Sequence, residues 1–173
     1  MAYNIMPAIM SACFLGLTKE EILKGLASYE SADGRMHVLN GTDRTVIDDC
    51  YNASPDSMTA AIETLAAWPG SGRHFAILGD MFELGAMEEE GHRTVGRGIA
   101  EKAGIDELWT VGTRARWIHE EASRSDVACR HFDTVEALME ALPAAVQPGD
   151  VILVKASHGM ALERIVRALI ETK

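Results

Sequence analysis

The sequence predicts an α/β protein, in which a mainly parallel sheet lies between two layers of helices. Three observations lead to this fold class. Short apolar segments alternate with amphipathic helical segments from residue 35 onward. The strand segments are almost entirely apolar, which is typical of strands buried on both faces. The chain has 173 residues, of which 47% are hydrophobic and 24% charged, so it is long enough for one globular domain with a short extra piece.

Residues 1–30 differ from the rest and are predicted to form two short helices. The first covers the apolar, Met- and Ala-rich segment from Tyr3 to Leu17, which reads as a buried helix and is closed by Gly16. Thr18 to Glu21 then has the capping-box pattern that starts a second helix. The pair carries more apolar surface than an isolated helical hairpin should expose. We therefore expect it to pack against another part of a protein.

The sheet is predicted from a hairpin and four further strands. Met36–Leu39 and Thr45–Ile47 flank the turn-like segment Asn40–Asp43, which indicates a β-hairpin. The other predicted strands are 75–78, 108–111, 127–132 and 151–154. This pattern gives about five parallel strands plus one antiparallel strand from the hairpin.

The helices between these strands have recognisable starts. Ser54 is a good N-cap and is followed by Pro55, whose missing N–H costs nothing at the first helical position. Thr113 is expected to cap a later helix, and Asp133 to Glu136 matches a capping box. A last helix is expected near residues 162–170.

Charge and cysteine content limit the possible functions. The net charge of −10 disfavours binding to DNA or RNA, because an acidic surface repels a phosphate backbone. The cysteines, Cys13, Cys50 and Cys129, have no metal-binding spacing and suit a reducing compartment. The most apolar stretch, residues 5–17, is too short to span a bilayer and does not resemble a secretory signal. A cytoplasmic location without membrane insertion is expected.

Functional residues of a parallel sheet are expected at the carboxyl ends of its strands. Asp48 and Asp49 end one strand just before a helix. They are suited to hold Mg²⁺ or accept from ribose hydroxyls, and a plain polar loop is an equal alternative. Asp80 follows Gly79 at the end of the next strand. Lys155 ends the last predicted strand, where a buried cation needs a carboxylate or an anion. An internal ion pair is its alternative role.

Several sequence motifs are absent. No GxGxxG follows the first strand, which disfavours a nicotinamide-dependent dehydrogenase, and no GxxxxGK[ST] phosphate loop occurs. Neither a serine nucleophile elbow nor HExxH is present. His92 is expected to be structural rather than a ligand. The residues alone therefore indicate a crevice with acids and a lysine, without an evident phosphate cradle or a complete catalytic set, and no residue is assigned as a metal ligand.

Five ordered segments resemble motifs of the Mur ligase family. Val46 to Met58 resembles a family segment containing DD-x-YNANPDSM, with Ser54 in place of the second asparagine. The others are Gly34-Arg35-Met36 (GRM), Leu78 to Gly85 (LGDMLELG), Gly91-His92 through Val95-Gly96 (H-x-x-VG) and Val154 to Met160 (VKGSRGM, here with Ala156 and His158). Together these matches cover most of the chain.

The resemblance implies that residues 31–173 form a carboxyl-terminal Rossmann-like Mur ligase domain, a three-layer sandwich. It implies that residues 1–30 are the tail of a central ATPase domain. The implied whole enzyme adds D-Ala-D-Ala to UDP-MurNAc-tripeptide through an acyl phosphate in peptidoglycan precursor synthesis. It uses ATP and Mg²⁺, bound mainly by the central domain and its phosphate loop. This chain alone is expected to be inactive.

Carried over by position, the resemblance gives two groups of site residues. Arg35, Asp49, Tyr51 and Asn52 would bind ATP, and Asp80, Lys155, Ser157 and His158 would line the dipeptide pocket. Loss of Lys155 is expected to weaken dipeptide use more than ATP affinity. The alternative function is a stand-alone receiver-like signalling module, which also has an acid pair, a later aspartate and a lysine.

Overall fold

The computed structural model describes residues 2–28, 34–102 and 104–171, and the chain divides into two compact units, Met1–Ser31 and Ala32–Lys173. The first unit contains helix α1 (Ala2–Phe14) and helix α2 (Lys19–Ala27). The predicted capping box is present, since Thr18 Oγ1 accepts from the N–H of Glu21 at 3.3 Å and Glu21 Oε2 accepts from the N–H of Thr18 at 2.8 Å.

Among its described residues, the first unit by itself leaves most of its large apolar side chains exposed, so its two helices do not provide the burial that was expected for the first helix. Phe14 is 91% exposed and Leu15 is 74% exposed. The other exposed large apolar residues of the unit are Met6, Met10, Leu17, Leu23 and Leu26. In the described part of the chain, no helix is long and apolar enough to cross a membrane.

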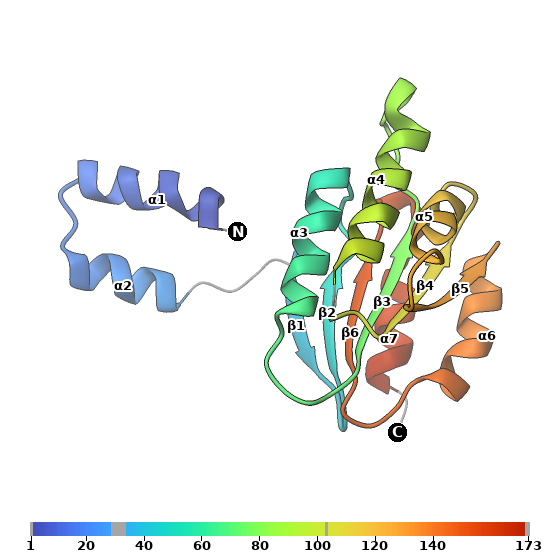
Figure 1. The fold of residues 1–173 in the computed structure, drawn as a ribbon. Coiled ribbons are helices and arrows are strands. Elements are labelled where there is room, and N and C mark those ends of the chain that lie inside the picture. Colours follow the sequence, from blue (N-terminus) through green and yellow to red (C-terminus); the bar gives the residue numbers. More distant parts are fainter. Residues whose placement is uncertain (1, 29–33, 103, 172–173) are drawn as a thin grey trace. The chain divides into compact units, whose positions relative to one another are not determined.

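The second unit is built on one six-stranded sheet (Figure 1). Its strands are β1 (His37–Asn40), β2 (Thr45–Asp49), β3 (His74–Gly79), β4 (Glu107–Val111), β5 (Ala128–Phe132) and β6 (Val151–Lys155). Their order is β1-β2-β6-β3-β4-β5, with β1 antiparallel to β2 and the remaining neighbours parallel. The predicted hairpin and the count of five parallel strands plus one antiparallel strand are confirmed.

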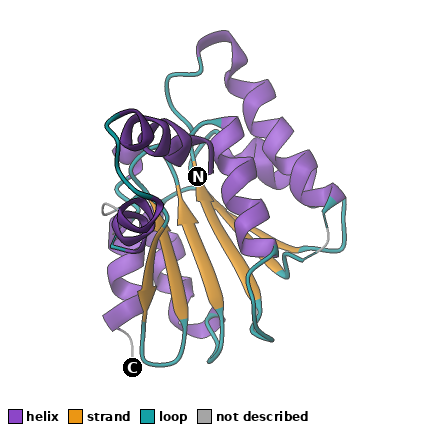
Figure 2. Ribbon diagram, turned by 90° about the vertical axis from the view of Figure 1, so that its left-hand side faces the viewer, coloured by secondary structure: helices purple, strands orange, loops and turns teal. Residues whose placement is uncertain are grey.

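Helices cover both faces of this sheet (Figure 2). One face packs against α3 (Pro55–Ala66), α4 (Glu88–Glu101) and α5 (Ala115–Ala122), with a short 3-10 helix, η1 (Gly85–Met87), before α4. The other packs against α6 (Val135–Ala145) and α7 (Glu163–Glu171), and η2 (His158–Met160) precedes α7. Each face has its own apolar core, which confirms the three-layer sandwich.

Of the predicted helix starts described here, the Ser54 cap is confirmed and the capping box at Asp133 to Glu136 is not. Ser54 caps α3 as expected, and its Oγ accepts from the N–H of Ser57 at 3.4 Å. The capping box proposed for Asp133 to Glu136 is wrong, because α6 begins one residue later with Thr134 as its N-cap. Strand β5 is also less buried than expected. It lies at the sheet edge and exposes alternate residues, including Arg130.

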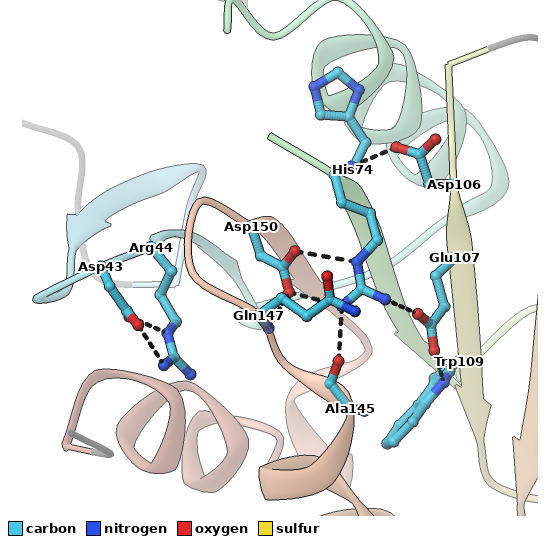
Figure 3. Close-up of polar contacts among 10 residues, drawn as sticks. Asp43, Arg44, His74, Asp106, Glu107, Trp109, Ala145, Gln147 and Asp150 are labelled. Carbon is cyan, nitrogen blue, oxygen red and sulfur yellow. Dashed lines mark hydrogen bonds and ion pairs between the residues drawn. The ribbon is translucent and has the colours of Figure 1, made fainter. Parts of the chain in front are cut away.

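Arg73 connects three strands at their amino-terminal ends, and its partners Glu107, Ala145 and Asp150 are labelled in Figure 3. Its guanidinium donates to Asp150 Oδ2 at 2.8 Å and to the carbonyl of Ala145 at 2.7 Å, and it also pairs with Glu107. The side chain of Asp150 is only 1% exposed, so its charge depends on this partner. The pairing holds the starts of β3, β4 and β6 together.

We expect Arg73→Met to lower the free energy of unfolding by about 3 kcal/mol, because it leaves the buried Asp150 carboxylate without its counterion. Urea denaturation of the chain measures this. The matched control is Arg164→Met, which breaks an exposed pair with Glu136 and should cost less than about 1 kcal/mol. Equal losses in the two variants would contradict this role of Arg73.

Candidate functional site

The carboxyl ends of β2 and β6 are joined by an ion pair between Asp49 and Lys155. The two residues are register partners, and Lys155 Nζ lies 2.6 Å from Asp49 Oδ2. The same ammonium donates to the carbonyl of Asn52 at 2.9 Å. The lysine side chain is only 2% exposed. Of the three acids at the strand ends, Asp48, Asp49 and Asp80, the one that pairs with Lys155 is therefore Asp49.

The aspartates at the end of β2 also accept hydrogen bonds from backbone N–H groups. Asp49 Oδ1 accepts from the N–H of Met36 at 3.1 Å, whereas Asp48 Oδ1 accepts from the N–H of Cys50 at 3.2 Å. Burial raises the pKa of the Cys50 thiol far above its usual range, with the nearby Asp48 carboxylate adding to the effect. Cys50 is therefore protonated and unsuited to act as a nucleophile.

Arg35 and Tyr51, both predicted site residues, are in direct contact. The guanidinium carbon of Arg35 lies 4.1 Å from the centre of the Tyr51 ring, a cation–π arrangement. The N–H of Tyr51 donates to the carbonyl of Gly34 at 2.9 Å. Gly34 has a φ of +71°, and a Cβ there would lie 3.1 Å from the Tyr51 nitrogen. Glycine therefore permits the close approach that places Arg35.

A hollow of about 340 Å³ opens beside this pair. Its lining residues are Tyr51, Asn52, Phe82, Glu83, Ser157, His158 and Gly159. Four of the eight predicted site residues are thus brought together here, namely Tyr51, Asn52, Ser157 and His158. Arg35 contacts Tyr51, while Asp49, Asp80 and Lys155 are not in the lining. Sequence reasoning missed Phe82, Glu83 and Gly159, although each lies inside a motif that carried the resemblance.

Asp80 caps a helix from the end of a neighbouring strand. Its side chain is 5% exposed, and Oδ1 accepts from the N–H groups of Arg114 at 3.0 Å and Ala115 at 2.7 Å. These are the first free donors of α5, so Asp80 does the work that the sequence assigned to Thr113. The cap expected from Thr113 is wrong, because α5 starts at Ala115 with no local side-chain cap.

We expect Gly112→Ala to destabilise the second unit by about 3 kcal/mol. Gly112 has a φ of +111°, and an added Cβ would lie 2.5 Å from Asp80 Oδ1 and push away the cap of α5. Thermal denaturation measures the loss. The matched control is Gly98→Ala in α4, which has open space around it and should be neutral or stabilising by up to about 1 kcal/mol. Similar stability in both variants would contradict this account.

Buried His92 holds the loop after β3. Its Nε2 accepts from the N–H of Met81 at 2.9 Å, and its Nδ1 lies 2.6 Å from the carbonyl of Glu88. Since Nε2 accepts and Nδ1 faces an acceptor, the ring is neutral with its proton on Nδ1. The structural role expected for His92 is consistent with these contacts.

We expect the free energy of unfolding to fall as the pH is lowered from 7.5 to 5.5. Burial is the first cause that lowers the pKa values of His92, His119 and His131. The unfolded chain, with histidine pKa values near 6.5, then binds protons before the folded chain does. Stability is therefore complete above about pH 6.5 and is lost as the pH falls toward the folded-state values. Urea titrations across this range measure the slope, and a flat or rising profile would contradict it.

Asp48 and Asp49 are the pair that the sequence suggested as Mg²⁺ ligands. Within residues 2–28, 34–102 and 104–171, no group of three His, Cys, Asp or Glu side chains is placed to hold a metal ion. Both oxygens of Asp49 and one oxygen of Asp48 are already bound by protein donors. The described residues therefore do not fit a Mg²⁺ site.

The strand order contradicts the receiver-like alternative. Numbered along the chain, the five parallel strands lie in the order 1-5-2-3-4, because β6 is inserted between β2 and β3. Receiver modules have the order 2-1-3-4-5. Asp80 also points to α5, whereas Lys155 pairs with Asp49, so the acids and the lysine do not form one cluster. The receiver-like interpretation is wrong.

Comparison with known proteins finds one matching family and relatives that share one name. The sequence model of the family described as "Mur ligase, glutamate ligase domain" matches residues 34–158. UDP-N-acetylmuramoyl-tripeptide–D-alanyl-D-alanine ligases from Bacillus subtilis and Escherichia coli are 38% and 37% identical. Each alignment covers 98% of this chain and 37% of the relative.

Solved structures agree with these sequence matches. The MurF ligase of Thermotoga maritima in complex with ADP superposes with a TM-score of 0.80 at 29% identity, over 97% of this chain and 37% of that one. A MurF structure from Acinetobacter baumannii gives a TM-score of 0.82 over 98% of this chain and 37% of that one, also at 29% identity. The chain thus spans little more than a third of the relatives that it matches.

Proposed function

The chain belongs to the Mur ligase family, and we propose from this that it is the carboxyl-terminal part of a UDP-N-acetylmuramoyl-tripeptide–D-alanyl-D-alanine ligase. The observation that carries the proposal is the match across 98% of the chain to ligases of that name. The whole enzyme would act in peptidoglycan precursor synthesis. We place it in the cytoplasm, where ATP and nucleotide-linked precursors are found.

The proposed reaction has two steps. The terminal carboxylate of UDP-MurNAc-tripeptide attacks the γ-phosphorus of ATP, which forms an acyl phosphate and releases ADP. The amine of D-Ala-D-Ala then attacks the acyl carbon, the C–O bond to phosphate breaks, and the amine proton passes to solvent or a base. Phosphate is a good leaving group, whereas oxide is not. Bound Mg²⁺ would neutralise phosphate charge, and we assign it to parts of the enzyme beyond this chain.

The nucleotide is proposed to contact the side of the hollow formed by Arg35, Tyr51 and Asn52. Arg35 offers a cation beside an exposed ring, a combination suited to phosphate or ribose oxygens. Asp49 contributes indirectly, since its carboxylate binds the N–H of Met36 and the ammonium of Lys155. It fixes the segment that carries Arg35 against the segment that carries Asn52.

The dipeptide is proposed to enter the same hollow from the η2 side. Ser157 and His158 line it and offer a hydroxyl and an imidazole to the peptide. Lys155 and Asp80 lie behind the wall, where the first anchors the Asn52 carbonyl and the second anchors α5. We propose that these two position the site rather than touch the substrate.

The helical hairpin of residues 1–30 is proposed to be the end of the central ATPase domain. Its exposed apolar side chains support this, since a partner surface within one protein would cover them. The relatives' greater length leaves room for such a domain.

The proposal is tested by assaying the full-length protein that carries this chain. With MgATP and UDP-MurNAc-tripeptide, mass spectrometry should show the pentapeptide product when D-Ala-D-Ala is supplied. The matched controls are D-alanine alone and L-Ala-L-Ala, which should give far less product. Failure to use D-Ala-D-Ala, or equal use of all three, would refute the proposed function.

The polypeptide of residues 1–173 is expected to show no ligation by itself, because its sequence contains no GxxxxGK[ST] loop to hold the ATP phosphates. The same assay, with the full-length protein as positive control, measures this. Product formation by the short polypeptide would contradict the expectation.

A further inference from the structure

Glu83 is the single carboxylate among the described residues that line the hollow. It is exposed, and in the described part of the chain its carboxylate has no hydrogen bond or ion pair. Two acids of the strand ends are engaged elsewhere, Asp49 with Lys155 and Asp80 with α5. Glu83 is therefore a free negative charge facing a space that otherwise has neutral polar and aromatic walls.

The backbone at Glu83 is strained. Its φ is +64°, in the left-handed region that glycine adopts freely and that other residues rarely enter. Glutamate also lacks the short polar side chain that eases this conformation for asparagine and aspartate. A costly residue at a position that glycine would fill more comfortably suggests that the side chain is needed there.

The loop that carries Glu83 is tied down on both sides. The N–H of Met81 donates to His92 Nε2 at 2.9 Å, and the N–H of Phe82 donates to Ser157 Oγ at 2.8 Å. The N–H of Ser157 in turn donates a hydrogen bond to the carbonyl of Asp80 at 3.0 Å. These contacts hold the loop against η2, so the backbone that carries the Glu83 side chain is fixed before any ligand arrives.

We propose that Glu83 binds the ammonium group of the incoming dipeptide and so orients the reacting nitrogen, an inference that rests on the proposed function. A zwitterionic dipeptide presents an ammonium at one end and a carboxylate at the other. In the hollow, Glu83 suits the first, and the donors Ser157 and His158 suit the second. Glu83 attracts only the ammonium end, whereas the neutral donors can bind the carboxylate, and this gives the dipeptide one direction of binding.

The test compares two ligands in the full-length enzyme and its Glu83→Gln variant. D-Ala-D-Ala carries the ammonium, and propionyl-D-alanine is the same molecule without it, used as a competitive inhibitor. We expect the variant to raise the KM for D-Ala-D-Ala about tenfold, as for a lost hydrogen bond to a charged group. The Ki of propionyl-D-alanine and the KM values for ATP and the tripeptide should stay unchanged.

Two further variants separate binding from folding. Glu83→Gly should raise the KM for D-Ala-D-Ala in the same way while its Tm is equal to or above that of the wild type, because the strain is relieved. Glu140→Gln, an equal charge change on exposed α6, should leave all constants unchanged.

Three outcomes would overturn the inference. They are an unchanged KM for D-Ala-D-Ala in Glu83→Gln, an equal rise for both ligands, and a lower Tm in Glu83→Gly. Each leaves the proposed function standing, provided that the wild type ligates D-Ala-D-Ala. A wild type that does not use the dipeptide refutes both proposals at once.

Discussion

Replacing Lys155 with methionine is expected to lower the free energy of unfolding by about 4 kcal/mol. The ammonium is almost fully buried and binds Asp49 at 2.6 Å and the Asn52 carbonyl at 2.9 Å. Methionine fills similar space but leaves the Asp49 carboxylate, 13% exposed, without its cation. Urea denaturation of wild type, Lys155→Met, Asp49→Asn and the double variant measures the loss and the coupling between the two residues. A loss below about 1 kcal/mol would contradict the buried ion pair.

The same substitution should affect both substrates of the full-length enzyme. Sequence position groups Lys155 with the dipeptide residues, but its contacts go to the Asp49–Asn52 segment, which carries candidate nucleotide residues. We therefore expect the KM values for ATP and for D-Ala-D-Ala to rise together. A rise for the dipeptide alone would favour direct contact between Lys155 and the dipeptide instead.

Replacing Asp80 with alanine is expected to cost about 3 kcal/mol of stability, because two N–H groups at the start of α5 lose their acceptor. Asp80→Asn retains an oxygen in the same place and should lose less than about 1 kcal/mol. Thermal denaturation of the two variants compares them. If the asparagine variant is as unstable as the alanine variant, the charge of Asp80 and not its capping oxygen is what the fold requires.

The elements that the sequence predicted well are those coded by neighbouring residues. The hairpin around Asn40–Asp43 and the Ser54 cap depend on residues a few positions apart. The insertion of β6 between β2 and β3 depends on how whole strands pack, and no local pattern specifies it. The capping of α5 by Asp80 has the same origin, since donor and acceptor lie 34 and 35 residues apart.

The error at α6 has a different cause. Asp133 and Thr134 are adjacent residues that both make good N-caps, so the sequence alone leaves the start of the helix uncertain by one position. The structure places Thr134 at the cap, and Glu136 pairs with Arg164 instead of closing a box.

Only part of the candidate site could be predicted from the sequence. Motif resemblance located Tyr51, Asn52, Ser157 and His158, which do line one hollow. It did not single out Glu83, because a left-handed backbone at a glutamate leaves no signature in the sequence. It also did not reveal that Asp80 and Lys155 lie outside the lining of that hollow, where Asp80 caps α5 and Lys155 binds the Asn52 carbonyl.

Of the two sides proposed for the hollow, the η2 side with Ser157 and His158 is expected to serve the attack of the dipeptide amine and not the phosphorylation step. Rapid-quench kinetics of the full-length enzyme, with ADP and pentapeptide measured separately, test this assignment. The variant is His158→Ala, which changes an exposed side chain, and Arg35→Ala is the comparison. We expect His158→Ala to keep the ADP burst and lose most of the pentapeptide, whereas Arg35→Ala should lower both. Equal loss of ADP and pentapeptide in His158→Ala would contradict it.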